Sequence, residues 1–333
     1  HDPKETAELD PGSLAAWYNL GRISLDRYLE SLYFESELRL AMERFRRARA
    51  ADVSHTGTIY NLALLNILGG DASEALRIAG EGMEMDSEDF ELRLVRAAAS
   101  VRLERYESAE DEFRSAFLLM DGVLRRTYED IRLLLPDEQS SYYFSLGDSL
   151  RLEFERKFWV MNDPTPSTAL NERRIEHYFR VFMARALFTD GRLGREGIDT
   201  DRGRATIKFG LPAAIDRDLG AGLYGPVLRW YYSTPNGDLV LTFMDEFLNG
   251  DYHIPIDPNF RGAADHTTGI LEGIPEIYDD PFEAGPVEAF HQASFRRSQD
   301  GNTTVEVSIA ASCPEGVCGG FGVDMALFDP DWR

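Results

Sequence analysis

The chain has 333 residues, with 35 lysines and arginines against 58 aspartates and glutamates, so its formal net charge at pH 7 is −23. Such an acidic protein repels phosphate backbones and anionic lipid, and it has no basic stripe with interleaved aromatic residues. Nucleic-acid binding and peripheral docking on anionic lipid are therefore disfavoured. The length allows two domains and a sizeable core. No run of about 18 apolar residues occurs, so we expect no direct membrane span.

Residues 12–121 repeat with a period of 34. The positions that recur are Ala41, Ala75 and Ala109; Phe45, Ala79 and Phe113; Ala48, Gly82 and Ala116; and Ala63 with Ala97. Small residues at fixed spacing allow two helices to cross closely. The period and the opening Trp17-Tyr18-Asn19-Leu20-Gly21 resemble the tetratricopeptide (TPR) family, with about eight extra residues near Tyr28 to Glu37 in the first repeat.

The TPR resemblance implies a solenoid of helix pairs whose concave face holds a partner. Candidate partner-binding side chains on the first helix of each pair are Trp17, Tyr18, Asn19, Tyr60, Asn61, Arg93 and Arg96. A plain scaffold without a bound peptide is the alternative. Ala7 to Pro11 resembles the end of an earlier repeat, so we expect further sequence upstream or a partner packed there.

Residues 122–135 continue as helix, and Pro136 then breaks the chain. A second helix is predicted from about Ser140 to Phe158, as a rigid coupler between the repeats and a central module. No Gly/Ser-rich or Pro-rich spacer intervenes. We therefore place the first domain boundary near Pro136.

A helix is predicted from Ser167 or Thr168, as its N-cap, to about Phe188. Its apolar residues have the spacing of one helix face and are Ile175, Tyr178, Phe179, Phe182, Met183, Ala186 and Leu187. The opposite face carries Glu172, Arg173, Glu176, His177 and Arg180. We expect this charged stripe to be solvated or to face a partner.

The segment that follows this helix reads Gly197-Ile198-Asp199-Thr200-Asp201-Arg202-Gly203-Arg204, and a Gly210-Leu211-Pro212 turn lies downstream. It resembles the GWxTD family, with Ile198 in place of the tryptophan, and Asp163-Pro164-Thr165-Pro166 and Asn171-Glu172 upstream extend the resemblance. The family implies an architecture and no established activity. The residues taken as its structural motif are Asp163, Pro164, Pro166, Asn171, Glu172, Gly197, Asp199, Thr200, Asp201, Arg202, Gly203, Arg204, Gly210 and Pro212.

Residues 204–210 have the pattern of a strand, and 228–233 with 239–244 have that of a hairpin closed by Asn236-Gly237. Together they predict a small antiparallel sheet under the preceding helix. Residues 256–285 are rich in Pro, Gly and Asp and are expected to wrap a surface. Strands are predicted at 303–309 and 321–328, which either pair with the central sheet or, as we favour, open a further β domain.

Two interpretations of the central carboxylates stay open. Asp199 and Asp201, with His177 or Glu172, could form an acid/base or metal-binding group. Alternatively, Asp199 and Asp201 hold a tight loop and pair with Arg180, Arg202 or Arg204. Cys313 and Cys318 are a candidate disulfide, or two free thiols around a turn, and make a poor zinc site. We expect no cofactor and no metal.

The sequence thus predicts an α+β protein in three parts: TPR-like repeats at 1–135, a coupler and GWxTD-like module with an antiparallel sheet at 136–255, and a β-containing region at 256–333. The expected function is that of a non-catalytic scaffold or accessory subunit whose partners are other proteins. The GWxTD resemblance implies an exported bacterial protein, in the periplasm or at the envelope, peripheral to a membrane and a subunit of a larger membrane-associated assembly. The alternatives are a cytoplasmic location and a hydrolase-like or metal-binding enzyme that uses the loop carboxylates.

Overall fold

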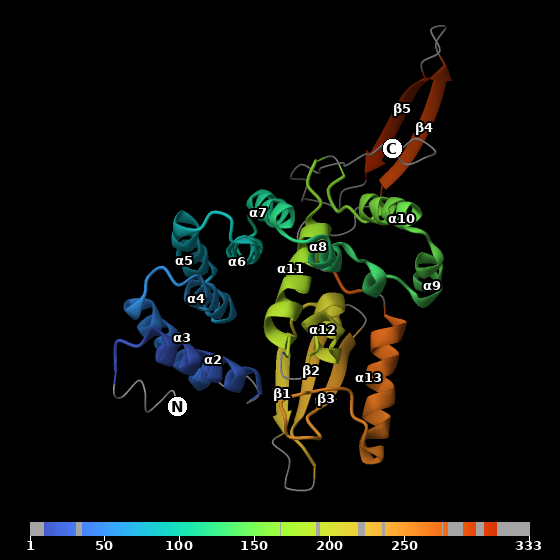
Figure 1. The fold of residues 1–333 in the computed structure, drawn as a ribbon. Coiled ribbons are helices and arrows are strands. Elements are labelled where there is room, and N and C mark those ends of the chain that lie inside the picture. Colours follow the sequence, from blue (N-terminus) through green and yellow to red (C-terminus); the bar gives the residue numbers. More distant parts are fainter. Residues whose placement is uncertain are drawn as a thin grey trace, which may run out of the picture. The chain divides into compact units, whose positions relative to one another are not determined.

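The computed structural model describes residues 10–30, 35–166, 168–190, 194–218, 224–234, 237–274, 276–278, 289–297 and 303–311. The chain separates into two compact units (Figure 1). One comprises His1–Asp163 with Leu170–Tyr278, and the other comprises Pro164–Ala169 with Asp279–Arg333. The larger unit is mostly helical with one small antiparallel sheet, which is compatible with an α+β class. Among the described residues, no helix is both long and apolar enough to cross a membrane.

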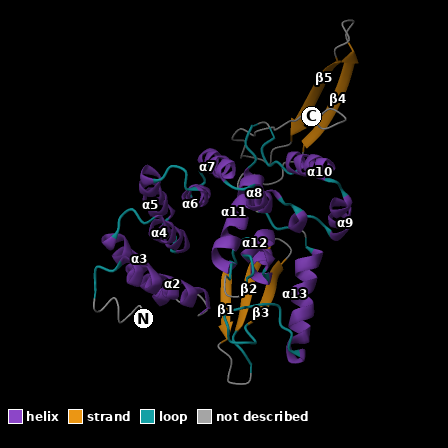
Figure 2. Ribbon diagram, viewed as in Figure 1, coloured by secondary structure: helices purple, strands orange, loops and turns teal. Residues whose placement is uncertain are grey.

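The larger unit begins with three pairs of helices (Figure 2). They are α2 (Leu14–Glu30), α3 (Glu35–Ala51), α4 (Thr56–Leu68), α5 (Ala72–Met85), α6 (Phe90–Arg102) and α7 (Tyr106–Leu119). The second and third pairs start 34 residues apart, as the repeat predicts, and the first pair is longer. That these pairs form a TPR solenoid stays a prediction.

The repeated positions lie in the packed interior of the helix pairs. All eleven are buried, from Ala41 in the first pair to Ala116 in the third. Gly82 shows why small residues recur, since a Cβ there would lie 2.8 Å from the Leu92 side chain and 2.9 Å from Ile59. The three helix caps His55, Asp71 and Asp89 each accept a backbone N–H of the helix they open, which sets the start of α4, α5 and α6.

Three helices and a short 3₁₀ turn connect the repeats to the central part. They are α8 (Gly122–Glu129), η1 (Arg132–Leu134), α9 (Asp137–Ser145) and α10 (Asp148–Met161). The single coupler helix predicted from Ser140 to Phe158 is wrong, because the chain breaks at Leu146-Gly147, where both residues are extended. The domain boundaries near Pro136 and after residue 255 stay predictions.

Helix α11 (Glu172–Phe188) forms where a helix was predicted, but its N-cap is Asn171, whose side chain accepts the Arg174 N–H. The predicted cap at Ser167 or Thr168 is therefore wrong. The chain then forms η2 (Gly197–Asp199) and α12 (Asp201–Phe209). The strand predicted at 204–210 is also wrong, because residues 204–209 belong to α12, in which seven of nine residues are buried, and Gly210 is its C-cap.

The sheet contains β1 (Ala214–Asp218), β2 (Val227–Thr234) and β3 (Gly237–Met244), antiparallel in the order β1-β2-β3. The predicted hairpin is confirmed as β2 and β3, with Thr234 paired to Gly237. Its buried face carries Trp230, whose ring lies 5.9 Å from Phe188 of α11. Because residues 204–209 are helical, the first strand of the sheet is β1, which follows α12 in the chain.

Residues 258–273, expected to wrap a surface without regular structure, form η3 (Pro258–Phe260) and α13 (Arg261–Gly273). This corrects the prediction. Helix α13 lies along the edge strand β3, where the Thr267 hydroxyl accepts the Thr242 N–H at 2.9 Å. The hydroxyl thus provides an acceptor for a backbone N–H of that edge strand. Without such a partner, the N–H groups of an exposed edge strand can pair with another chain.

The smaller unit contains a two-stranded antiparallel hairpin of β4 (Ala289–Arg297) and β5 (Thr303–Ala311). The predicted strand at 303–309 is confirmed. Among the described strands its partner is β4 and not a strand of the central sheet. Cys313, Cys318 and the strand predicted at 321–328 lie outside the described residues.

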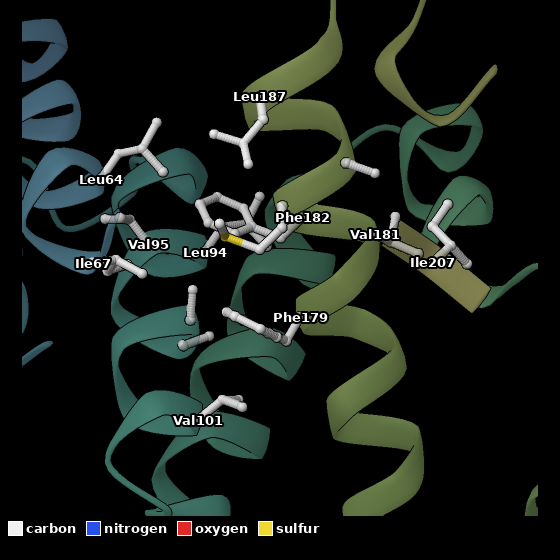
Figure 3. Packing of buried hydrophobic residues seen from close by; sticks show 14 of the residues in the cluster. Leu64, Ile67, Leu94, Val95, Val101, Phe179, Val181, Phe182, Leu187 and Ile207 are labelled. Atoms are coloured by element: carbon white, nitrogen blue, oxygen red, sulfur yellow. The ribbon is translucent and has the colours of Figure 1, made fainter. Parts of the chain in front are cut away.

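Helix α11 packs against the first helices of the repeats (Figure 3). Leu64 and Ile67 of α4 and Leu94 of α6 face Phe179 and Phe182 of α11. All five side chains are buried. The opposite side of α11 meets α12, where Val181 lies beside Ile207. The inner side of the repeats, which the TPR resemblance assigns to a partner, is here covered by a helix of the same chain.

Candidate functional site

The GWxTD-like loop is built on two glycines that allow backbone segments to touch. A Cβ on Gly197 would lie 2.1 Å from the carbonyl oxygen of Ala184 in α11. A Cβ on Gly203 would lie 1.8 Å from the carbonyl oxygen of Gly197. Thr200 fastens the same corner, since its hydroxyl donates to the Gly197 carbonyl at 2.8 Å and accepts the Gly203 N–H at 3.0 Å. Thr200 is thereby the N-cap of α12.

The two carboxylates of this loop point to different places. Asp201 accepts the Ile254 N–H at 2.9 Å and lies 3.7 Å from the Arg204 guanidinium. Asp199 is largely exposed and lies 3.6 Å from the Arg132 guanidinium. The contacts of Asp201 with a backbone donor and Arg204 agree with the interpretation in which this carboxylate has a structural role, whereas the contact of Asp199 is with Arg132 and not with Arg180, Arg202 or Arg204.

His177 lies on α11, with its ring 5.4 Å from the Trp159 ring. Burial and the neighbouring Arg180 lower the pKa of the imidazole to about 3, so the ring is neutral at pH 7. Neither ring nitrogen makes a well-formed hydrogen bond to a described residue, although backbone groups of Tyr128 and Asp130 lie close enough to favour the protonated ring. His177 is thus a buried neutral histidine.

A cavity of about 580 Å³ lies beside this histidine. His177 and Asp199 both line it, together with Arg132, but Asp201 does not. Within the described ranges, no three His, Cys, Asp or Glu side chains are placed so as to hold a metal ion together. The structure therefore brings together two of the three alternative catalytic residues.

The charged stripe of α11 is buried, which corrects the expectation of a solvated face. Glu172, His177 and Arg180 are each less than a tenth exposed. Arg180 pairs with Glu176 at 2.9 Å and donates to the Ile277 carbonyl at 2.8 Å. Glu276 lies 3.8 Å from Arg180 and also pairs with Arg173. Residues 276–278, which come about 100 positions later in the sequence, thus cover this charged stripe.

The remaining motif residues also have structural surroundings. Asn171 donates from its amide to the Trp159 carbonyl at 2.7 Å in addition to capping α11. Gly210 ends α12 with a φ of 76°, a conformation that favours glycine. Pro212 follows it before β1, while Asp163, Pro164 and Pro166 lie in the connection between α10 and α11.

The candidate partner-binding side chains of the repeats largely contact the chain itself. Trp17 donates to the Pro11 carbonyl at 2.8 Å under the Arg47 guanidinium, and Tyr18 packs edge-on against Phe45. Asn61 is buried and donates to the Gly57 carbonyl at 2.7 Å.

Further along the repeats, Arg93 and Arg96 both pair with Glu112, at 3.3 and 3.0 Å. Tyr60 is partly buried as well, and this burial raises the pKa of its hydroxyl above the usual value. Asn19 is exposed.

Sequence reasoning missed the role of Arg202. Its guanidinium carbon lies over two aromatic rings, 4.9 Å from the centroids of both Phe188 and Tyr252. It also missed Asp245, a buried carboxylate that accepts the Asn249 and Gly250 N–H groups. The turn-rich sequence Asn249-Gly250-Asp251 marks this turn, but nothing in it indicates that Tyr252 reaches Arg202.

Comparison with protein-family models gives no match for this chain, and comparison with curated proteins gives none either. Its function is therefore inferred from its geometry and from the resemblances described above.

Proposed function

We propose that this protein is a non-catalytic scaffold or accessory subunit that binds other proteins through helices α7 to α10. The observation that carries the proposal is the distribution of exposed apolar side chains. Of the seventeen large ones in the described part of the chain, eight lie between residues 118 and 161. These eight are Leu118, Leu119, Val123, Tyr142, Phe144, Leu150, Leu152 and Met161. Concentrations of exposed apolar surface are typical of interaction sites.

The packing of α11 on the repeats supports the same choice of surface. Phe179 and Phe182 already cover the inner side of α4 and α6, so a partner peptide would have to displace a buried helix to reach it. The apolar residues of α7 to α10 are accessible without such a change. This proposal therefore moves the partner surface from the concave side of the repeats to the helices that follow them.

The nature of the partner comes from the GWxTD resemblance. It leads us to propose a peripheral position in a larger, membrane-associated bacterial assembly, in the periplasm or at the envelope. With a net charge of −23, the chain is suited to partners that present a basic rim around an apolar centre.

The test is recovery of the native assembly from source membranes in mild detergent. The tagged protein is compared with a triple variant, Phe144→Ser, Leu150→Ser and Leu152→Ser, whose side chains are each more than half exposed. A matched control replaces the exposed Val53 and Met85 of the repeat region by serine. We expect stoichiometric recovery of a defined set of proteins with the wild type and the control, and its loss with the triple variant. Equal recovery with the triple variant would contradict the proposed surface.

A hydrolase-like or metal-binding enzyme is the second candidate, favoured by the shared cavity of His177 and Asp199. A bound divalent metal would raise the melting temperature, because ligands that bind only the folded state stabilise it. A metal-dependent rise that Asp199→Asn abolishes would support the enzyme. An unchanged melting temperature with each divalent metal would count against a metal site.

A further inference from the structure

A second cavity, of about 290 Å³, lies between α2 and the segments that follow α11 and β3. Its apolar walls are Leu29, Leu187 and Phe188. Its cationic groups are Arg22, which is exposed at the rim, Arg195 and the buried Arg202. The cavity is separate from the one beside His177, and a ligand there is independent of the proposed scaffold function.

Within the described residues, Arg202 is a buried cation without a paired anion. The residue is 7% exposed, and its Nη2 donates to the Gly250 carbonyl at 3.3 Å. Its Nε and Nη1 have no hydrogen-bond partner, and no carboxylate forms an ion pair with it, among the residues that the structure describes. The rings of Phe188 and Tyr252 stabilise the charge through cation–π contacts but cannot accept the hydrogen bonds that Nε and Nη1 could donate in the plane of the guanidinium.

Arg180 shows what a buried guanidinium of this chain normally has. This residue is similarly buried, at 6% exposed, yet it pairs with Glu176 at 2.9 Å and lies 3.8 Å from Glu276. Buried charges in proteins are ordinarily paired in this way. The difference between the two arginines suggests that the anion of Arg202 comes from a ligand in the cavity.

The carboxylates around the cavity limit the charge of that ligand. Asp251 already pairs with Arg195 at 2.6 Å, and Asp26 and Asp190 also line the walls. Three nearby carboxylates disfavour a dianion such as phosphate more than a singly charged group. Leu29, Leu187 and Phe188 are the apolar part of a lining that is otherwise mostly polar, and they can contact carbon atoms that lie beside the charge of the ligand.

We propose that this cavity binds a small monocarboxylate with an apolar body, whose carboxylate accepts hydrogen bonds from Arg202. Arg22 at the rim adds a second positive charge, and Leu29, Leu187 and Phe188 contact the hydrocarbon part. Arg202 is the residue that binds the ligand, and the two rings position its guanidinium.

Isothermal titration calorimetry of the full chain tests this site with acetate, butyrate and hexanoate as probes. Butyramide has nearly the same shape as butyrate without the charge, and inorganic phosphate supplies a charge without an apolar body. We expect butyrate to bind at least about tenfold more tightly than either control, since charge-assisted hydrogen bonds are about twice as strong as neutral ones. Equal binding of butyrate and butyramide, or no binding of any acid, would overturn the proposal.

Variants locate the binding site. Arg202→Met keeps an apolar side chain against the rings of Phe188 and Tyr252 and should weaken butyrate binding at least about tenfold. Arg22→Gln changes an exposed residue, leaves the fold intact and should weaken it about threefold, so it serves even if Arg202→Met does not fold. Arg114→Gln, on the exposed side of α7, should have no effect. Unchanged affinity in Arg22→Gln, or in a folded Arg202→Met, would also overturn the proposal.

Discussion

Gly203 lies against the backbone of Gly197, so closely that a Cβ on Gly203 would come within 1.8 Å of the Gly197 carbonyl oxygen. Gly203 in the first turn of α12 and Gly197 in η2 therefore set how α12 approaches α11, because Gly197 in turn lies against Ala184. A side chain at either position would collide with backbone atoms, which cannot move aside as the end of a flexible side chain can.

The substitution Gly203→Ala should accordingly destabilise the protein by about 2–3 kcal/mol, in spite of the better helix propensity of alanine. Gly262→Ala is the matched control, since Gly262 also lies in the first turn of a helix and a Cβ there would have nothing within 4 Å. Urea denaturation should show the control unchanged or up to about 1 kcal/mol more stable. Similar stability of the two variants would mean that the close approach is wrong.

Asp201→Ala should cost about 1–2 kcal/mol, because it leaves the Ile254 N–H without its acceptor and removes the partner of Arg204. Asp199→Ala, two residues earlier, is the control. Asp199 is 61% exposed and has a 3.6 Å contact with Arg132, so its loss should change the free energy of unfolding by less than about 0.5 kcal/mol. Thermal or urea melts of both variants measure the difference. Equal costs for the two carboxylates would contradict the structural role of Asp201.

The sequence predicted the repeat helices and the β2–β3 hairpin because their signals are local. Buried small residues at a period of 34 and the Asn236-Gly237 turn each specify structure over a short span. The strand predicted at 204–210 failed because Thr206 and Lys208 are buried as well as Ile207, so alternation of polar and apolar residues carried no information. The cap at Thr200 and the contacts of Gly203 determined a helix instead.

The candidate site could be predicted only in part. Gly197, Thr200 and Gly203 were identified as motif residues, and their roles follow from contacts that a sequence does not display. The charge stripe of α11 looked solvated because Glu276, which pairs with Arg173 and Arg180, lies about 100 residues away. Long-range pairs of this kind have no local sequence signal.

His177 should make the stability of the protein depend on pH between about 3 and 6.5. The imidazole takes up a proton near pH 6.5 in the unfolded chain but only near pH 3 in the folded one. The unfolded state therefore binds more protons in this window, and the free energy of unfolding falls as the pH is lowered through it. At pH 5 the contribution of His177 is a loss of about 2 kcal/mol relative to pH 7.

Urea denaturation at pH 7 and pH 5 measures this effect against His177→Phe, which keeps a ring of similar size without the titration. Carboxylates contribute equally to both proteins, so the wild type should lose about 2 kcal/mol more than the variant. Equal losses would show that His177 titrates normally in the folded state and is not buried as described.

Phe182→Ala should be among the costliest single truncations, at about 3–5 kcal/mol, because the side chain is 2% exposed between α11 and the repeats. Phe144→Ala removes an equally large but exposed side chain and should change stability by less than about 0.5 kcal/mol. Chemical denaturation distinguishes the two. A cost below about 1 kcal/mol for Phe182→Ala would indicate that α11 does not pack on α4 and α6.

Hydroxyl-radical footprinting of the free protein and of the native assembly examines both surfaces in one experiment. If α11 covers the inner side of the repeats, Phe179 and Phe182 should stay unreactive in both states. If α7 to α10 provide the partner surface, Tyr142, Phe144 and Met161 should react in the free protein and become protected in the assembly. Reactive Phe179 and Phe182 in the free protein, or unchanged reactivity of Tyr142, Phe144 and Met161 in the assembly, would contradict the proposed partner surface and the packing that motivates it.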